Sequence, residues 1–172
     1  MSKKWIDCSK LGRSKEKECA ELLIESEGGK IRWATKEEDM FKHIDFYWVK
    51  DGKDIGIDVK SARKKNRCDL EPNYEINWVE LKNVHGRKGW LDGEMDYIVF
   101  EHKEFWFFVK PDRIKELLKE KMSNENEICD SKEIYKFYRR KGRLDLLVMV
   151  PNDDLVKIAS KILKKKRKWV KL

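Results

Sequence analysis

The chain has 172 residues and a formal net charge of +8, from 40 Lys and Arg against 32 Asp and Glu. This length fits a single domain that buries about 70% of its unfolded surface, and the charge favours a polyanionic partner. No apolar run reaches the roughly 18 residues of a membrane-spanning helix, and the first residues lack the apolar segment of a signal peptide. Four scattered cysteines without a CxxC pair argue against a disulfide framework or a zinc ribbon. We therefore expect a cytoplasmic protein with no membrane segment.

The first third of the chain predicts a helix followed by strands. Helical spacing of apolar residues predicts a helix over residues 14 to about 27, which Gly28 and Gly29 end. A short strand over 30–34 and a helical turn over 36–40 follow.

Residues 43–60 predict a β-hairpin, because Asp51-Gly52 lies between two β-rich runs and this pair favours a type I′ turn. The turn fixes the register of the two strands. The expected pairs are Lys50 with Lys53, Trp48 with Ile55, Phe46 with Ile57, Asp45 with Asp58, and Ile44 with Val59.

Alternation along these strands puts the apolar side chains on one face and Asp45, Asp58 and Lys60 on the other. The apolar set is Ile44, Phe46, Trp48, Ile55, Ile57 and Val59. Two facing carboxylates about 5 Å apart repel by on the order of 3 kcal/mol at an effective dielectric of about 20. A divalent cation would remove this repulsion. The alternative is a solvated hairpin whose acids pair with nearby lysines.

The remainder predicts one mixed α/β domain over 1–172 that ends in a basic C-terminal tail. Strands are expected at 74–82, 96–101, 104–110, 134–138 and 144–150. Polar or glycine-rich loops are expected at 63–73, around Gly86, Gly89 and Gly93, and at 123–131. Helices are expected at 112–122 and from Pro151 onward.

An Asp followed by Asp-x-Lys on the adjoining strand, after a helix with a glutamate, resembles the PD-(D/E)xK nuclease superfamily. That superfamily includes restriction endonucleases, archaeal-type Holliday junction resolvases and many phage nucleases. Asp45 matches the first acid, Asp58-Val59-Lys60 the second half of the motif, and Glu18 the helical glutamate of resolvase-like members. Over residues 14 to about 110, the resemblance implies a restriction-endonuclease-like fold with a mixed central sheet flanked by helices.

The resemblance also implies roles for these residues. Asp45, Asp58 and the backbone carbonyl of Val59 would bind Mg²⁺, for which Mn²⁺ can substitute, and Lys60 would act on the attacking water or the phosphate. Of five (D/E)xK triplets in the chain, Asp58/Lys60 alone combines a strand, an apolar opposite face and a second acid in register. Glu80, from the rival triplet Glu80/Lys82, is a candidate extra acid.

Two basic segments are candidates for binding DNA phosphates. One is Arg63, Lys64, Lys65 and Arg67, which leaves the motif strand, and the other contains Arg87 and Lys88. The alternative for either segment is a solvated loop, and adjacency to Asp45 and Asp58 favours DNA binding. The Lys-rich tail either binds nucleic acid or solvates the end of a helix. Trp90 in the second segment is either a loop anchor or a surface on which a base stacks.

These patterns predict a metal-dependent DNA endonuclease with a structure-selective role in recombination or repair, as in junction resolvases. A restriction-type endonuclease and a non-catalytic DNA-binding module on the same fold stay open, as does a homodimer. The chain contains no GxSxG, Walker or GxGxxG motif, and His43, His85 and His102 lack zinc-ligand spacing with the cysteines.

Overall fold

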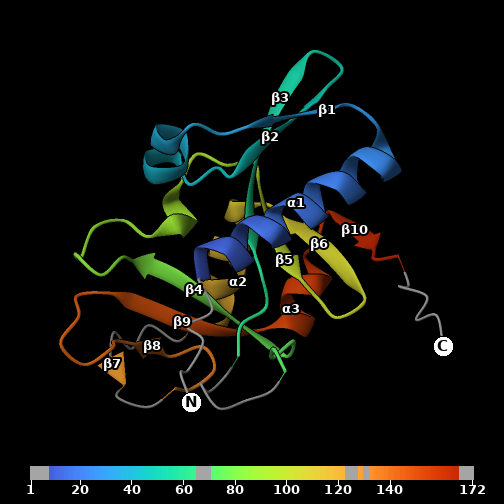
Figure 1. Ribbon diagram of the computed structural model, residues 1–172. Helices are drawn as coiled ribbons and strands as arrows, with labels where there is room; N and C mark the ends of the chain where they lie inside the picture. The colour runs from blue at the N-terminus through green and yellow to red at the C-terminus, as the bar shows by residue number, and fades with distance from the viewer. Residues whose placement is uncertain (1–7, 65–70, 123–127, 130–131, 167–172) are drawn as a thin grey trace, which may run out of the picture.

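The computed structural model describes residues 8–64, 71–122, 128–129 and 132–166, which form two mixed β-sheets and three α-helices (Figure 1). The six-stranded sheet has the order β1 (Lys30–Trp33), β2 (Phe46–Lys50), β3 (Lys53–Lys60), β5 (Tyr97–Glu101), β6 (Phe105–Val109) and β10 (Lys161–Lys164). The four-stranded sheet has the order β4 (Ile76–Lys82), β9 (Leu146–Pro151), β8 (Phe137–Tyr138) and β7 (Ile128–Cys129). The helices are α1 (Cys8–Glu27), α2 (Pro111–Lys121) and α3 (Asn152–Lys157), with shorter turns η1 (Glu38–Lys42) and η2 (Trp90–Asp92).

The centre of the six-stranded sheet is buried on both faces. Helix α1 lies across one face, where Cys19 and Leu23 pack against Phe46, Ile57 and other apolar residues of the sheet (Figure 1). The other face packs against α2, α3 and the four-stranded sheet. Central strands β5 and β6 therefore need apolar side chains on both sides, which explains their nearly continuous apolar sequence.

The hairpin forms with the predicted turn and register. Asp51 and Gly52 both have positive φ, 51° and 73°, and the paired residues run from Lys50 opposite Lys53 to Phe46 opposite Ile57. The last two predicted pairs, which involve Asp45 and Ile44, are wrong. The Asp45 amide donates to the Ile57 carbonyl at 2.8 Å although Phe46 already lies opposite Ile57, so two residues face one, as in a β-bulge.

The bulge also moves Ile44 out of the predicted apolar face. Ile44 packs into the core on the side of α2 and the four-stranded sheet, whereas Phe46, Trp48 and Ile57 pack beneath α1. A single inserted residue puts every side chain beyond it on the opposite face of the sheet, because side chains alternate with period two.

Several other boundaries differ from expectation. Helix α1 begins at Cys8 rather than at residue 14, and it ends before Gly28 and Gly29, both with positive φ. The strand predicted over 74–82 belongs to the second sheet, where β4 pairs with β9. The strand predicted over 134–138 shortens to β8, and β7 forms inside the predicted polar loop. The last helix is short, and β10, which the sequence did not predict, pairs antiparallel with β6.

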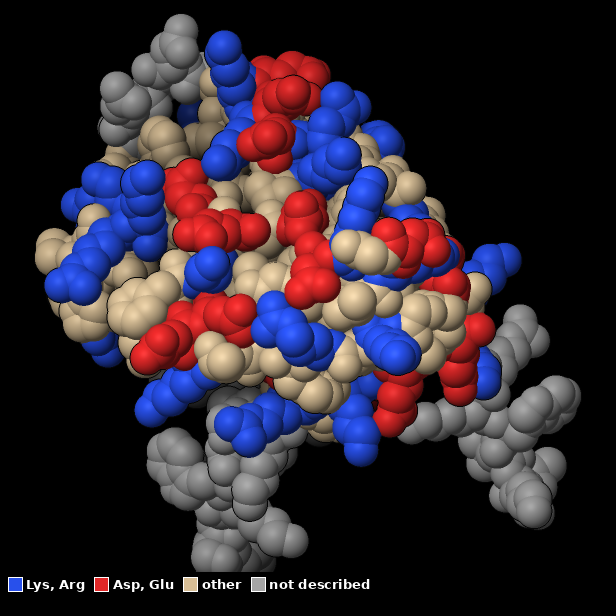
Figure 2. Space-filling model, turned by 90° about the horizontal axis from the view of Figure 1, so that it is seen from above, with Lys and Arg blue, Asp and Glu red and all other residues tan. Residues whose placement is uncertain are grey.

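One face of the molecule shows how its charged side chains are distributed. In the view from above, acidic and basic side chains intermingle on that face rather than separating into one basic patch (Figure 2). No α-helix within the described ranges has the length and apolar character needed to cross a membrane.

Candidate functional site

The candidate site lies where β2 stops and β3 continues. Strand β2 begins at Phe46, whereas β3 extends to Lys60 along β5. The Asp45 carboxylate occupies the gap, where its Oδ2 accepts a hydrogen bond from the Val59 amide at 2.6 Å. On the other side the Asp45 carbonyl accepts from the Ala34 amide at 3.1 Å. Backbone contacts to both neighbouring segments therefore fix Asp45.

Asp58 and Lys60 form a close ion pair beside Asp45. Asp58 is 3% exposed, and Lys60 Nζ lies 2.7 Å from each of its carboxylate oxygens, aligned for a hydrogen bond with Oδ1. Asp58 Oδ2 is buried and lies within ion-pair distance of Lys60, but it accepts no hydrogen bond from the described residues. Lys60 Nζ also lies 4.9 Å from the centre of the Trp90 ring. An acid on one side and an aromatic face on the other thus hold the ammonium group in place.

The site places two acids, Asp45 and Asp58, beside one lysine. Burial raises the pKa of Asp45, and the neighbouring Asp58 charge raises it further. The Val59 amide and the Lys60 ammonium act in the opposite direction without restoring the pKa to its ordinary value. Ionised Asp45 is therefore unfavourable in the metal-free protein.

These residues fit a site for a divalent cation. Mg²⁺ typically takes one or two protein carboxylates and completes its shell with waters and substrate phosphates. Asp45 and Asp58 supply the carboxylates, and Asp58 Oδ2 retains acceptor capacity. The N–H and C=O of one strand residue point toward the same neighbouring strand, so the Val59 carbonyl faces the gap that Asp45 occupies. Among the described residues, no three His, Cys, Asp or Glu side chains form a complete protein cage for a metal.

The helical acid near Asp45 is Glu16, which the sequence interpretation missed. Glu16 and Asp45 line the same cleft, and burial followed by the charge of Asp39 raises the pKa of Glu16. The sequence contained a signal for it, because positions 16, 19, 20 and 23 follow helical spacing. Cys19, Ala20 and Leu23 form the buried stripe, so Glu16 continues this stripe toward the site.

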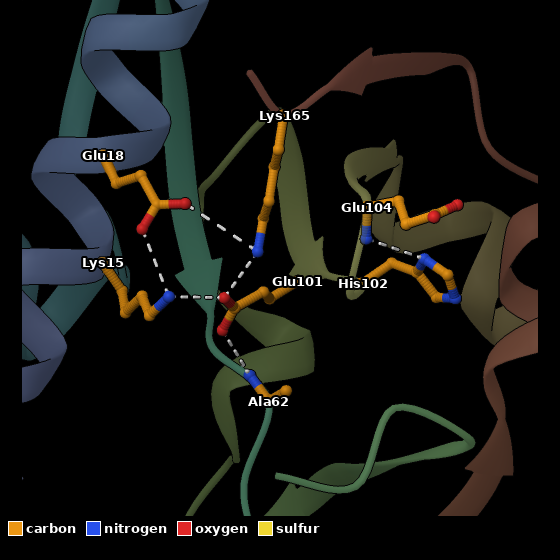
Figure 3. A network of polar contacts seen from close by, with 7 residues as sticks. All are labelled: Lys15, Glu18, Ala62, Glu101, His102, Glu104 and Lys165. Atoms are coloured by element: carbon orange, nitrogen blue, oxygen red, sulfur yellow. Dashed lines mark hydrogen bonds and ion pairs between the residues drawn. The ribbon is translucent and has the colours of Figure 1, made fainter. Parts of the chain in front are cut away.

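Glu18 takes part in a different group of charges (Figure 3). It pairs with Lys15 at 3.2 Å and with Lys165 at 3.8 Å. Both lysines also contact Glu101, at 2.6 and 2.7 Å. We call Lys15, Glu18, Glu101 and Lys165 the Glu101 cluster. The structure thus places Glu18 in this cluster rather than in the cleft that contains Asp45.

The Glu101 cluster fixes the chain just beyond Lys60. Glu101 is 1% exposed, and its Oε2 accepts a hydrogen bond from the Ala62 amide at 3.0 Å (Figure 3). This contact sets the direction in which the basic segment after Lys60 leaves the sheet.

Glu80 reaches the neighbourhood of Lys60 from the second sheet. It is half-buried on β4, and burial raises its pKa while the nearby charges of Lys60 and Arg140 lower it. Glu80 therefore approaches the site on the lysine side, across the interface between the two sheets.

The predicted phosphate-binding residues are exposed where the structure describes them. Arg63 and Lys64 follow Ala62 directly, whereas Lys65 and Arg67 lie outside the described residues. Arg87 and Lys88 are exposed in a turn that Asn83 closes with hydrogen bonds to the backbone. The interpretation of Trp90 as a surface for base stacking is wrong, because the ring is 8% exposed and packs against Phe100.

Comparisons with models of protein families, with curated proteins and with solved structures find no significant match to this chain.

Proposed function

We propose that the chain is a metal-dependent nuclease that hydrolyses DNA phosphodiester bonds on a restriction-endonuclease-like fold. The arrangement of Asp45, Asp58 and Lys60 at the point where β2 and β3 separate carries the proposal. A structural ion pair needs one acid and one lysine. Asp45 is a second, partly buried acid, and its raised pKa means that it lowers the stability of the metal-free protein. A cation-binding site explains why such an acid is present.

The residues would divide the chemistry as follows. Asp45, Asp58 and the Val59 carbonyl hold the cation, which when bound acidifies water and neutralises charge on the phosphate. Lys60, fixed by Asp58 and Trp90, either orients the attacking water or donates hydrogen bonds to the phosphate oxygens. Glu16 lies on the α1 side of the same gap, where its carboxylate can hold a water by hydrogen bonding.

A structure-selective role, as in a junction resolvase, is the particular activity that we propose. The described residues form no unit beyond the two packed sheets and their helices, so we assign recognition to loops beside the site. A restriction-type endonuclease fits the same residues, and two copies of the chain would let it cut both strands. The second candidate class is a non-catalytic DNA-binding module. In that case Asp58 and Lys60 would serve only as a structural ion pair.

The test is a cleavage assay with purified protein. Linear duplex, single-stranded, flapped and four-way-junction DNA are each incubated with Mg²⁺, with Mn²⁺ or with EDTA. The proposal expects metal-dependent cleavage, with branched substrates cut fastest. DNA binding without cleavage of any substrate in either metal would favour the non-catalytic module.

A further inference from the structure

We propose that the cleft beside Asp45 receives an unpaired nucleotide, with Trp33 stacked on its base. The cleft lies between the first half of α1 and the segment that follows β1, and it encloses about 820 Å³. We call it the Trp33 cleft; its lining includes Arg13, Glu16, Lys17, Trp33, Lys36 and Asp45. The inference rests on the proposed function and adds to it the class of DNA that the site accepts.

Trp33 is fixed in position next to the proposed metal ligand. It ends β1 opposite Phe46, and the two rings meet edge to face with centroids 5.6 Å apart. The next residue, Ala34, donates its amide to the Asp45 carbonyl at 3.1 Å. Any group stacked on Trp33 therefore lies beside the acid on which the proposed chemistry depends.

The ring is also available for stacking. Trp33 remains 48% exposed although Phe46 covers one of its edges. The exposed part of the ring belongs to the lining of the cleft, where a planar base can stack on it.

The charges around Trp33 suit a nucleic-acid strand. Arg13, Lys17 and Lys36 are exposed side chains of the cleft lining, whereas Asp45 is partly buried. Proteins bind single strands by combining basic side chains, which contact the phosphate backbone, with aromatic rings, which stack on the bases. The lining also contains the acids Glu16, Asp39 and Asp45, so we expect the phosphates of the strand along Arg13, Lys17 and Lys36 and its base against Trp33.

The stacking requires an unpaired base. In a continuous duplex each base face is covered by its neighbours, so a protein ring reaches it only after the base is flipped out or when the strand is already single. Single-stranded ends, flaps and gaps therefore fit the Trp33 cleft better than uninterrupted duplex does.

Binding in EDTA tests the inference without cleavage. Fluorescence anisotropy compares labelled oligothymidine of about 16 nucleotides with a duplex of the same length, for wild type, Trp33→Ala and Trp33→Phe. We expect Trp33→Ala to weaken single-strand binding by roughly 5- to 150-fold, from about 1–3 kcal/mol per stacked base, and to leave duplex binding unchanged. Trp33→Phe should retain most of the affinity. Equal losses on both DNAs, or no loss on either, would overturn the inference.

Two controls separate stacking from general damage. Ile162→Ala changes a side chain of equal exposure, 48%, on β10 at the other edge of the six-stranded sheet, and it should affect neither DNA. In a series of oligonucleotides with one abasic nucleotide each, wild type should lose affinity at one position, and Trp33→Ala should be insensitive to it. A uniform response of wild type along the series would contradict stacking at a single site.

The outcome is distinguishable from failure of the proposed function. Cleavage in Mg²⁺ or Mn²⁺ with no effect of Trp33→Ala on single-strand binding would overturn the stacking alone. Trp33-dependent binding of single strands with no cleavage under any condition would overturn the nuclease and, with it, the location of the base beside a scissile phosphate.

Discussion

The Asp45 carboxylate hydrogen-bonds to the Val59 amide at 2.6 Å, where a continued β2 would have paired with β3. This one contact separates the two strands, satisfies the backbone of the motif strand and places a second acid beside Asp58. A structural role and the proposed metal-binding role thus fall on the same side chain, and substitutions that preserve the hydrogen bond can separate them.

Asp45→Asn should raise the melting temperature of the metal-free protein. The amide oxygen can still accept from the Val59 amide, and Asn removes the cost of either ionising Asp45 beside Asp58 or keeping it protonated above its ordinary pKa. A gain of 1 kcal/mol corresponds to about 2–4 °C in a chain of this size. Thermal unfolding in EDTA measures it, with Asp54→Asn on the exposed part of β3 as the control. A destabilised Asp45→Asn would mean that the charge itself supports the fold.

Mg²⁺ or Mn²⁺ should stabilise the wild-type protein, because a ligand that binds only the folded chain shifts unfolding by mass action. At 100 times Kd the gain is about 2.7 kcal/mol. Asp45→Asn and Asp58→Asn should each reduce the metal-dependent rise in melting temperature, whereas Asp54→Asn should not. The same rise in all four proteins would place the cation elsewhere.

Glu101→Gln should destabilise the protein above about pH 5, by up to about 3 kcal/mol, since it leaves Lys15 and Lys165 without a buried partner. Burial alone would raise the pKa of Glu101, but hydrogen bonds and charges from these two lysines hold it below its ordinary value. A lowered pKa in the folded state gives stability that is lost as the pH falls through that pKa.

The difference in the free energy of unfolding between Glu101→Gln and wild type should therefore become smaller at acidic pH. Denaturant unfolding from pH 7 down to about pH 3 measures this difference. Glu104→Gln, an exposed neighbour, is the control. A gap that stays constant over this range would show that the Glu101 charge is not what stabilises the cluster.

The hairpin shows how far local sequence patterns reach. The turn residues Asp51 and Gly52 and the alternation on each side determined the register as far as Phe46, because all of these interactions are local. The bulge at Asp45 was not predicted, since it involves a hydrogen bond with Ala34, outside the hairpin, and one between the Asp45 side chain and the Val59 backbone. The predicted register already brought Asp45, Asp58 and Lys60 together, and the structure adds the way Asp45 is held, by its hydrogen bond with the Val59 amide.

Other differences also come from contacts distant in sequence. Glu16 and Glu18 differ little in local sequence, and the packing of α1 on the sheet determines which one reaches the cleft. Strand β10 has the short pattern Lys-Ile-Leu-Lys, which buries only Leu163 and is recognisable only beside β6. The strand over 74–82 was predicted, but nothing in its own sequence assigns it to a second sheet with β9.

Replacing Arg63 and Lys64 with Gln should weaken DNA binding and flatten its salt dependence by up to about 2 units of log K per log salt, if each side chain contacts one phosphate. Turnover at saturating DNA should survive far better than in Lys60→Ala, because in the proposed function these residues would hold substrate, whereas Lys60 would act in the transition state. The control replaces Lys119 and Lys121 of α2 with Gln, which removes the same amount of charge. An unchanged salt slope in the Arg63/Lys64 variant would place DNA elsewhere on the surface.

The most direct measurement is the single-turnover cleavage rate of Asp58→Asn in Mg²⁺, beside wild type and Asp54→Asn, with DNA affinity measured for each protein in EDTA. The substitution retains the shape of the side chain and removes one charge that the proposed cation requires. We expect cleavage to fall by at least about 100-fold while DNA affinity is retained and Asp54→Asn cuts like wild type. Cleavage by Asp58→Asn at the wild-type rate would contradict the assignment of Asp58 and the site built around it.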